Sequence, residues 1–195
     1  LNKGPKSGPF LFLKRYIMKW KRNDKVIEEP IVDYLEKLLQ EEIDKGFRLK
    51  VSIGTDSQKA EKGTYKFATV ILISTSQDLG GVIVGRGGMI ISSTYYHAFK
   101  QTNKELVNER MVFEVGKSIE VAYDLAPLLD LYEIPLEIHA DINPDPNHES
   151  NKALQQAVGY ILGMGYDFKV KPEAWAASSA ADKKCWFFIR LLVYL

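Results

Sequence analysis

Three β-rich runs follow one another in the first half of the chain, and this feature most limits the folds open to it. They cover residues 49–57, 65–74 and 81–92, and their connections are short and polar. In the first run Leu49, Val51 and Ile53 alternate with polar residues, which is the period of a strand with one buried face. Short polar connections between such runs favour antiparallel hairpins. The sequence therefore predicts three neighbouring antiparallel strands.

Helices and strands alternate in the second half. A capping-box signature at residues 102–105 opens a long helical pattern that reaches Leu129, and Pro135 marks its far limit. The pattern continues with a strand, a helix, a short strand and a terminal helix, at residues 136–140, 151–162, 168–172 and from 179 onward. Residues 179–182 resemble a second capping box, which is expected to open the terminal helix at Ser179. A meander followed by this alternation predicts an α/β domain with a mixed sheet, antiparallel first and parallel afterwards, flanked by helices.

The N-terminal part differs in character. Residues 1–25 form a basic, aromatic-containing arm, and a helix is expected at residues 31–43 with Gly46 at its end. We therefore divide the chain into an arm and helix at 1–46 and an α/β domain at 47–195. The arm is a candidate for contacts with nucleic-acid phosphates, although a solvated segment packed on the domain is an equal alternative. Its candidate residues are Lys14, Arg15, Lys19, Lys21 and Arg22.

Composition excludes several classes of protein. With 26 Lys and Arg against 25 Asp and Glu, the net charge is +1, so only a local patch can favour nucleic acid. The single cysteine, Cys185, permits neither an intramolecular disulfide nor a thiolate zinc cluster, which favours a reducing compartment, the cytoplasm. No apolar run reaches the length of a membrane span, so no membrane partner is expected.

Four carboxylates lie where polar sites gather in α/β sheets. Asp56 ends the first strand of the meander, and Asp141 ends the strand after the long helix. Glu114 lies on that helix, and Asp182 lies in the first turn of the last helix. Polar sites of such sheets form at strand ends and adjacent helix termini, so we expect these four groups to converge.

A cluster of carboxylates implies metal chemistry. Hard oxygen ligands suit Mg²⁺ or Mn²⁺, and without a cation the carboxylates would repel one another and raise each other's pKa values. Two divalent ions relieve this repulsion and can orient the attacking water and the leaving oxygen at a phosphodiester. The residues therefore predict hydrolytic phosphoryl chemistry with two ions.

The long helix offers two glutamates, Glu109 and Glu114. They are five residues apart and so point about 140° apart around the helix, which means that only one can be a primary ligand. Glu114 lies close to the stripe of Met111 and Leu125 that should face the sheet, and an acid on a buried stripe needs a partner. Glu114 is therefore favoured, and Glu109 is a secondary candidate.

Each acid also has a structural alternative. Asp56 can simply form a turn after its strand, and Asp145 can cap the loop between two prolines. Asp182 can act as a helix-capping acid, a role worth about 0.5–2 kcal/mol. Trp175 can stack a nucleobase, but a core or hinge position is an alternative for it.

The sequence resembles the YkuK-like family of predicted ribonuclease H-like nucleases. The resemblance covers residues 49–189 and is carried by Ile53-Gly54-Thr55-Asp56-Ser57-Gln58, Asp141-Ile142-Asn143-Pro144-Asp145-Pro146 and Lys171-Pro172-Glu173-Ala174-Trp175-Ala176-Ala177-Ser178. It implies a five-stranded mixed sheet flanked by helices and a divalent-metal nuclease site. It also implies that His148 can assist proton transfer from its loop, the alternative being an ordinary loop histidine.

The function expected on this basis is hydrolysis of phosphodiester bonds in nucleic acid. A non-catalytic nucleic-acid-binding module that retains the fold is the alternative. An actin-like ATPase is disfavoured because no glycine-rich phosphate turn follows Asp56. The sequence leaves open whether the substrate is RNA, DNA or a hybrid, and it leaves open the oligomeric state.

Overall fold

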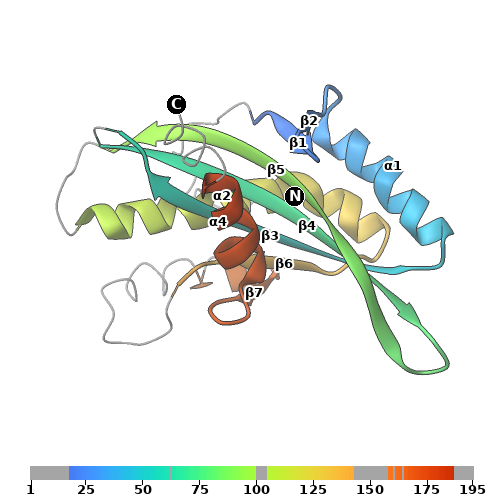
Figure 1. The fold of residues 1–195 in the computed structure, drawn as a ribbon. Coiled ribbons are helices and arrows are strands. Elements are labelled where there is room, and N and C mark those ends of the chain that lie inside the picture. The colour runs from blue at the N-terminus through green and yellow to red at the C-terminus, as the bar shows by residue number, and fades with distance from the viewer. Residues whose placement is uncertain are drawn as a thin grey trace, which may run out of the picture.

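The computed structural model describes residues 18–61, 63–99, 105–142, 158–159, 161–163 and 165–186. Within these ranges a single sheet of seven strands has the order β2-β1-β5-β4-β3-β6-β7 (Figure 1). The mixed α/β architecture is therefore confirmed, but the expected count of five strands is wrong, because a small hairpin before the meander joins the sheet.

The three predicted meander strands form the centre of the sheet. They are β3 (Arg48–Lys59), β4 (Thr64–Asp78) and β5 (Ile83–Ala98), paired antiparallel in that order. On the other side of β3 lies β6 (Leu136–His139), and β7 (Asp167–Lys169) follows it; both of these pairings are parallel. The expected change from antiparallel to parallel pairing is confirmed.

The additional hairpin comes from the predicted basic arm. Its strands are β1 (Trp20–Arg22) and β2 (Lys25–Val26), and β1 pairs with β5. The two residues between them, Asn23 and Asp24, have φ angles of 49° and 62°, the left-handed region that tight two-residue hairpin turns require. Strands of three and two residues are too short to show a periodic pattern, which explains why the sequence indicated only an arm.

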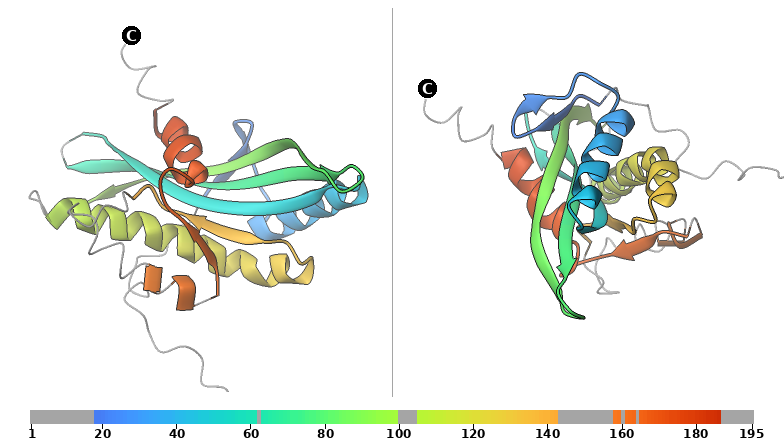
Figure 2. Two further views of the ribbon diagram at one scale, coloured as in Figure 1. Left: turned by 90° about the horizontal axis from the view of Figure 1, so that it is seen from below. Right: turned by 90° about the vertical axis from the view of Figure 1, so that its right-hand side faces the viewer.

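Helices cover both faces of the sheet (Figure 2). One face carries α1 (Ile31–Asp44) and α2 (Glu105–Leu131), and the other carries the π-helical segment η1 (Ala176–Ala181) and α4 (Asp182–Trp186). The terminal helix therefore does not start at a capping box on Ser179, because helical structure already begins at Ala176; that expectation is wrong. Most of the predicted helix at 151–162 lies outside the described residues.

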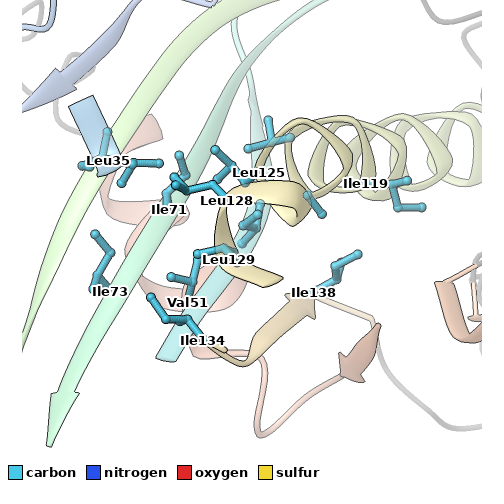
Figure 3. Close-up of a cluster of buried hydrophobic side chains, with 14 of the residues drawn as sticks. Leu35, Val51, Ile71, Ile73, Ile119, Leu125, Leu128, Leu129, Ile134 and Ile138 are labelled. Atoms are coloured by element: carbon cyan, nitrogen blue, oxygen red, sulfur yellow. The ribbon is translucent and has the colours of Figure 1, made fainter. Parts of the chain in front are cut away.

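Two apolar clusters hold these layers together. The larger joins α1, α2 and one face of the sheet through residues such as Leu35, Val51, Ile71 and Leu125 (Figure 3). The smaller packs alanines of η1 and Cys185 against Ala68, Val70 and Leu72 of β4. Burial of this apolar surface contributes roughly 25 cal/mol per Å² to folding. The larger cluster includes residues on both sides of residue 46, and a domain division at that position stays a prediction.

No helix in the described part of the chain combines the length and the apolar composition needed to cross a membrane.

Candidate functional site

The candidate site lies at the end of β3 that extends beyond its neighbour β6. The parallel pairing stops at Gly54 and His139, so residues 55–59 have no strand on that side within the described residues. Asp141 follows the last residue of β6 by two positions, and its charge raises the pKa of Asp56. Asp56 lies on the sheet face covered by η1, because side chains along a strand alternate between faces and Val51 and Ile53 face α1 and α2. Because no strand in the described part of the chain covers this edge of β3, side chains from helices on both faces of the sheet can reach the end of β3.

Asp56 is the central carboxylate of this site. Its side chain is only 8% exposed and accepts a hydrogen bond from the backbone N–H of Ser57. Its pKa is raised from 3.8 to about 7, chiefly by burial and in addition by the charges of Asp141 and Asp182. The Ser57 N–H and the Arg110 charge act in the opposite direction and offset only part of this rise. Asp56 therefore carries a carboxylate that is costly to ionise without a cation beside it.

Asp141, two residues after β6, and Asp182, the first residue of α4, both lie near enough to Asp56 for their charges to raise its pKa. The Oδ1 atom of Asp141 lies 2.9 Å from Nζ of Lys171. That contact lacks hydrogen-bond geometry, so this buried oxygen has no hydrogen-bond donor among the described residues. The Oδ1 atom of Asp182 accepts a hydrogen bond of 2.9 Å from Nε2 of Gln58, which lies on the same face of β3 as Asp56.

Glu114 reaches the same place from α2, on the opposite face. Its Oε1 accepts a hydrogen bond of 2.6 Å from the Ser57 hydroxyl and lies 3.7 Å from Nε of Arg110. Burial raises its pKa to about 8, and the neighbouring Asp56 raises it in the same direction. The two carboxylates thus repel each other around the open edge of β3.

A chain of buried hydroxyl groups fixes the position of α2 relative to β3. The Ser118 hydroxyl donates to Thr55 Oγ1 at 2.9 Å, and Thr55 Oγ1 lies 3.0 Å from Thr69 Oγ1. Tyr95 continues the chain, with its hydroxyl 3.1 Å from Thr69. Ser118 is one helical turn after Glu114 on the same face of α2. These hydroxyl contacts therefore fix the position along β3 at which Glu114 reaches Ser57.

A second set of contacts fixes η1 and α4 on the other face. The buried ammonium of Lys66 donates to the backbone carbonyls of Lys184 and Cys185 at 3.1 and 3.0 Å, where it satisfies the end of α4. The Cys185 thiol donates to the carbonyl of Asp56 at 3.4 Å. Burial raises the pKa of this thiol, so it stays protonated and able to donate. These contacts hold Asp182 in place near Asp56.

His139 anchors the start of η1. Its Nδ1 accepts the backbone N–H of Ala176 at 3.1 Å, and its Nε2 lies 3.2 Å from Oε2 of Glu137. Nδ1 therefore carries no proton and Nε2 donates, which assigns the neutral tautomer. Burial lowers the pKa of His139 in agreement with this. His139 is thus a positioning residue beside Asp141.

The donor set fits a hard divalent cation. It consists of carboxylate oxygens, one of which, Oδ1 of Asp141, is buried without a hydrogen-bond donor. The pKa values of Asp56 and Glu114 are both raised, and a nearby cation would lower them toward their ordinary values. In the part of the chain that the structure describes, no three Asp, Glu, His or Cys side chains already lie close enough to hold an ion. Two cationic side chains contact the cluster instead, Lys171 and Arg110.

The other predicted site residues do not join this cluster. Glu109 is exposed on α2, as the helical angle between it and Glu114 predicts. Lys19 and Lys21 are exposed near β1, while Arg22 donates to the Tyr34 hydroxyl at 3.2 Å. Four further candidates lie outside the described residues: Lys14, Arg15, Asp145 and His148.

Several residues at the site were missed by reasoning from sequence. Ser57 and Gln58 directly follow Asp56 and donate hydrogen bonds to Glu114 and Asp182, but polar residues near the end of a strand have no distinctive pattern. Arg110 lies four residues before Glu114, a spacing that brings side chains together on a helix and was a usable signal.

The side chain of Trp175 is 46% exposed, so the core position considered for it from the sequence is wrong.

A family model described as ribonuclease H-like matches residues 30–185 of the chain. The match covers most of the sequence, contains all four candidate carboxylates and extends to α1, which the resemblance noted from sequence did not cover. Neither a comparison with curated proteins nor one with solved structures found a match.

Proposed function

Because this chain belongs to the ribonuclease H-like family, we propose that it is a divalent-metal-dependent nuclease that hydrolyses phosphodiester bonds in nucleic acid. Mg²⁺ or Mn²⁺ is the proposed cofactor, as a pair of ions. The proposed ligands are the four carboxylates Asp56, Glu114, Asp141 and Asp182.

The convergence of these carboxylates on residues 56–58 of β3 is the observation that carries the proposal. Glu114 accepts a hydrogen bond from Ser57 and Asp182 accepts one from Gln58, the two residues that follow Asp56. The charge of Asp141 raises the pKa of both Asp56 and Glu114. The four carboxylates come from four separate parts of the chain, so local turn or capping roles do not explain why they lie in one region. Strongly perturbed carboxylates that gather in this way are typical of functional sites.

The protein's own groups would hold and orient the ligands. Ser57 Oγ and Gln58 Nε2 donate to Glu114 and Asp182 and so fix which oxygens face the cluster. Because the pKa of Asp56 is about 7, cation binding near neutral pH should release a proton from it. Bound divalent ions would supply the positive charge that stabilises the attacking and leaving oxygens of an in-line displacement.

Nucleic acid is the partner that the family suggests, and its type is open. Of the three members of the predicted basic set that lie in the described part of the chain, Lys19 and Lys21 are exposed and can contact phosphates. The cytoplasm is the compartment we propose, on the basis that the single cysteine is buried as a free thiol.

Cleavage of a labelled substrate panel tests the proposal. The panel contains an RNA–DNA hybrid, single strands, duplexes and a four-way junction, each assayed in Mg²⁺ and in Mn²⁺. Asp141→Asn removes one carboxylate charge at the cluster, and Glu109→Gln, on the exposed face of α2, is the matched control. Loss of groups that only support metal ligands costs about 10–100-fold, so Asp141→Asn should lower the cleavage rate by at least about a hundredfold.

The outcomes separate the two candidate functions. Cleavage by the wild type and Glu109→Gln but not by Asp141→Asn supports the nuclease. If no substrate is cut while Mn²⁺ binding still requires Asp141, the non-catalytic binding module is the better description. Equal cleavage by the wild type and Asp141→Asn would contradict the assigned site.

A further inference from the structure

Among the described residues, two cationic side chains contact carboxylates of the cluster, and each contacts a different one. Nζ of Lys171 lies 2.9 Å from Oδ1 of Asp141, and Nε of Arg110 lies 3.7 Å from Oε1 of Glu114. Each cation therefore faces a carboxylate of the proposed metal site. Partly exposed ion pairs contribute little to stability. Stability therefore does not explain why both cations lie beside proposed metal ligands.

We propose that Lys171 and Arg110 form the binding site for the phosphodiester group of the nucleic-acid substrate. In the metal-free protein the same two side chains neutralise Asp141 and Glu114. This inference rests on the proposed function and adds to it the residues that would contact the substrate's anionic group.

The geometry of Lys171 favours such an exchange of partners. Its contact with Asp141 is close but lacks hydrogen-bond geometry, and its side chain is 51% exposed. An ammonium group on a flexible stem can turn from a carboxylate to a phosphate at little cost, because its three donors have no fixed plane. Lys169, two residues earlier, pairs instead with Glu173 at 3.4 Å.

The geometry of Arg110 favours a fixed phosphate contact. Its guanidinium lies over the Tyr65 ring, 5.4 Å from the centroid, and this contact helps to hold it in place. Glu114 already has a shorter contact with the Ser57 hydroxyl, at 2.6 Å, so Arg110 is not its principal hydrogen-bond donor. The Nε–H of Arg110 is buried without an acceptor among the described residues. A planar guanidinium with donors to spare suits the oxygens of a phosphate.

The charge balance leads to the same assignment. The four carboxylates can carry four negative charges, and Lys171 and Arg110 offset two of them in the metal-free protein. A pair of divalent ions would offset all four, and the two side-chain cations would then be in excess. One phosphodiester group of the substrate would supply one of the two negative charges needed to balance them, and the next phosphate along the strand can supply the other.

The test measures Mn²⁺ binding and nucleic-acid binding separately, neither of which is catalytic activity. The variants are Lys171→Gln and Arg110→Gln, with Lys169→Gln as the matched control and Asp141→Asn as the control for the metal site. Mn²⁺ affinity is measured by calorimetry. Binding of a fluorescein-labelled RNA–DNA hybrid and of a labelled single-stranded RNA is measured by anisotropy in Ca²⁺ over a range of salt concentrations.

Opposite changes are expected in the two measurements. Lys171→Gln removes a charge that competes for Asp141, so Mn²⁺ affinity should rise about fivefold, the effect of about 1 kcal/mol for a unit charge in contact at the surface. Nucleic-acid affinity should fall, and the slope of log affinity against log salt should become shallower by about 1, the effect of one lost phosphate contact. Arg110→Gln should weaken nucleic-acid binding similarly, and Lys169→Gln should change neither quantity.

Three results would overturn the proposal, and they are distinguishable. If Lys171→Gln and Arg110→Gln bind both nucleic acids with the wild-type affinity and salt slope, the phosphate site is wrong. If the wild type binds Mn²⁺ through Asp141 but Lys171→Gln behaves as Lys169→Gln does in both measurements, Lys171 has no role and the metal site stands. If the wild type binds no Mn²⁺, the proposed function fails together with this inference.

Discussion

Replacing Asp56 by asparagine should stabilise the metal-free protein at pH 8, whereas most substitutions of buried residues destabilise. The reason is the cost of ionising this carboxyl group in the folded protein. Its pKa is about 7, against 3.8 for an ordinary aspartate, because it is buried and faces Asp141 and Asp182. A shift of about three pKa units corresponds to about 4 kcal/mol between the two protonation states.

The sign of the pH dependence follows from the direction of this shift. A carboxyl group whose pKa is raised by folding contributes its full stability below its unfolded pKa, near 4. That contribution is lost as the pH rises through its folded pKa, near 7, because only the unfolded chain releases the proton in between. Between pH 5 and pH 7 the loss amounts to about 3 kcal/mol. Asparagine does not titrate, so the variant should escape this loss.

Urea unfolding in EDTA, followed at pH 5 and at pH 8, measures the effect. The quantity compared is the free energy of unfolding of Asp56→Asn minus that of the wild type. This difference should be about 3 kcal/mol larger, in favour of the variant's stability, at pH 8 than at pH 5. Asp130→Asn, which changes an exposed aspartate of α2, is the control and should show the same relative stability at both pH values. If Asp56→Asn shows no difference between the two pH values, the reasoning about repulsion and burial is refuted.

Three further predictions concern metal, hydrogen bonding and packing. Mn²⁺ at a hundred times its Kd should raise the wild-type free energy of unfolding by about 2.7 kcal/mol. Asp141→Asn should remove most of that gain in a thermal melt, and an undiminished gain would place the ion elsewhere. Ser57→Ala should cost about 1–3 kcal/mol in urea unfolding, because Glu114 loses its 2.6 Å donor; a change near zero would show that Arg110 alone satisfies it. Leu125→Ala should cost about 2–5 kcal/mol by opening a cavity in the core, while calorimetry finds the Mn²⁺ affinity of the folded protein unchanged. A parallel loss of Mn²⁺ affinity would mean that this packing and the site are not separable.

The central part of the fold was predictable because its signals are local. Alternation in residues such as Val51 and Ile53, and the short polar connections, indicate β3, β4 and β5 without knowledge of the rest of the chain. The β1–β2 hairpin was missed because its few residues gain their strand conformation from pairing with β5. The Ser179 capping signature was misleading, since the same residue pattern also fits the interior of a helical segment that begins earlier.

Some residues of the candidate site were also predictable from local signals, and others were not. Asp56 and Asp141 were predictable because each lies near the carboxyl end of a strand, Asp56 inside β3 and Asp141 just after β6. Glu114 was preferred to Glu109 by the angle between them on the helix. The roles of Ser57, Arg110 and Lys171 depend on the register between α2 and β3 and on the path of the chain after β7, which only the tertiary structure provides.

The central claim is that a divalent ion binds at the open end of β3 between carboxylates from separate elements. A crystal of the full chain soaked in Mn²⁺, with anomalous diffraction data, tests this directly. The account predicts an anomalous peak at coordinating distance from the carboxylates of Asp56 and Asp141, absent from crystals of Asp141→Asn. A well-diffracting crystal with no peak there, or with its only peaks away from β3, would contradict the account.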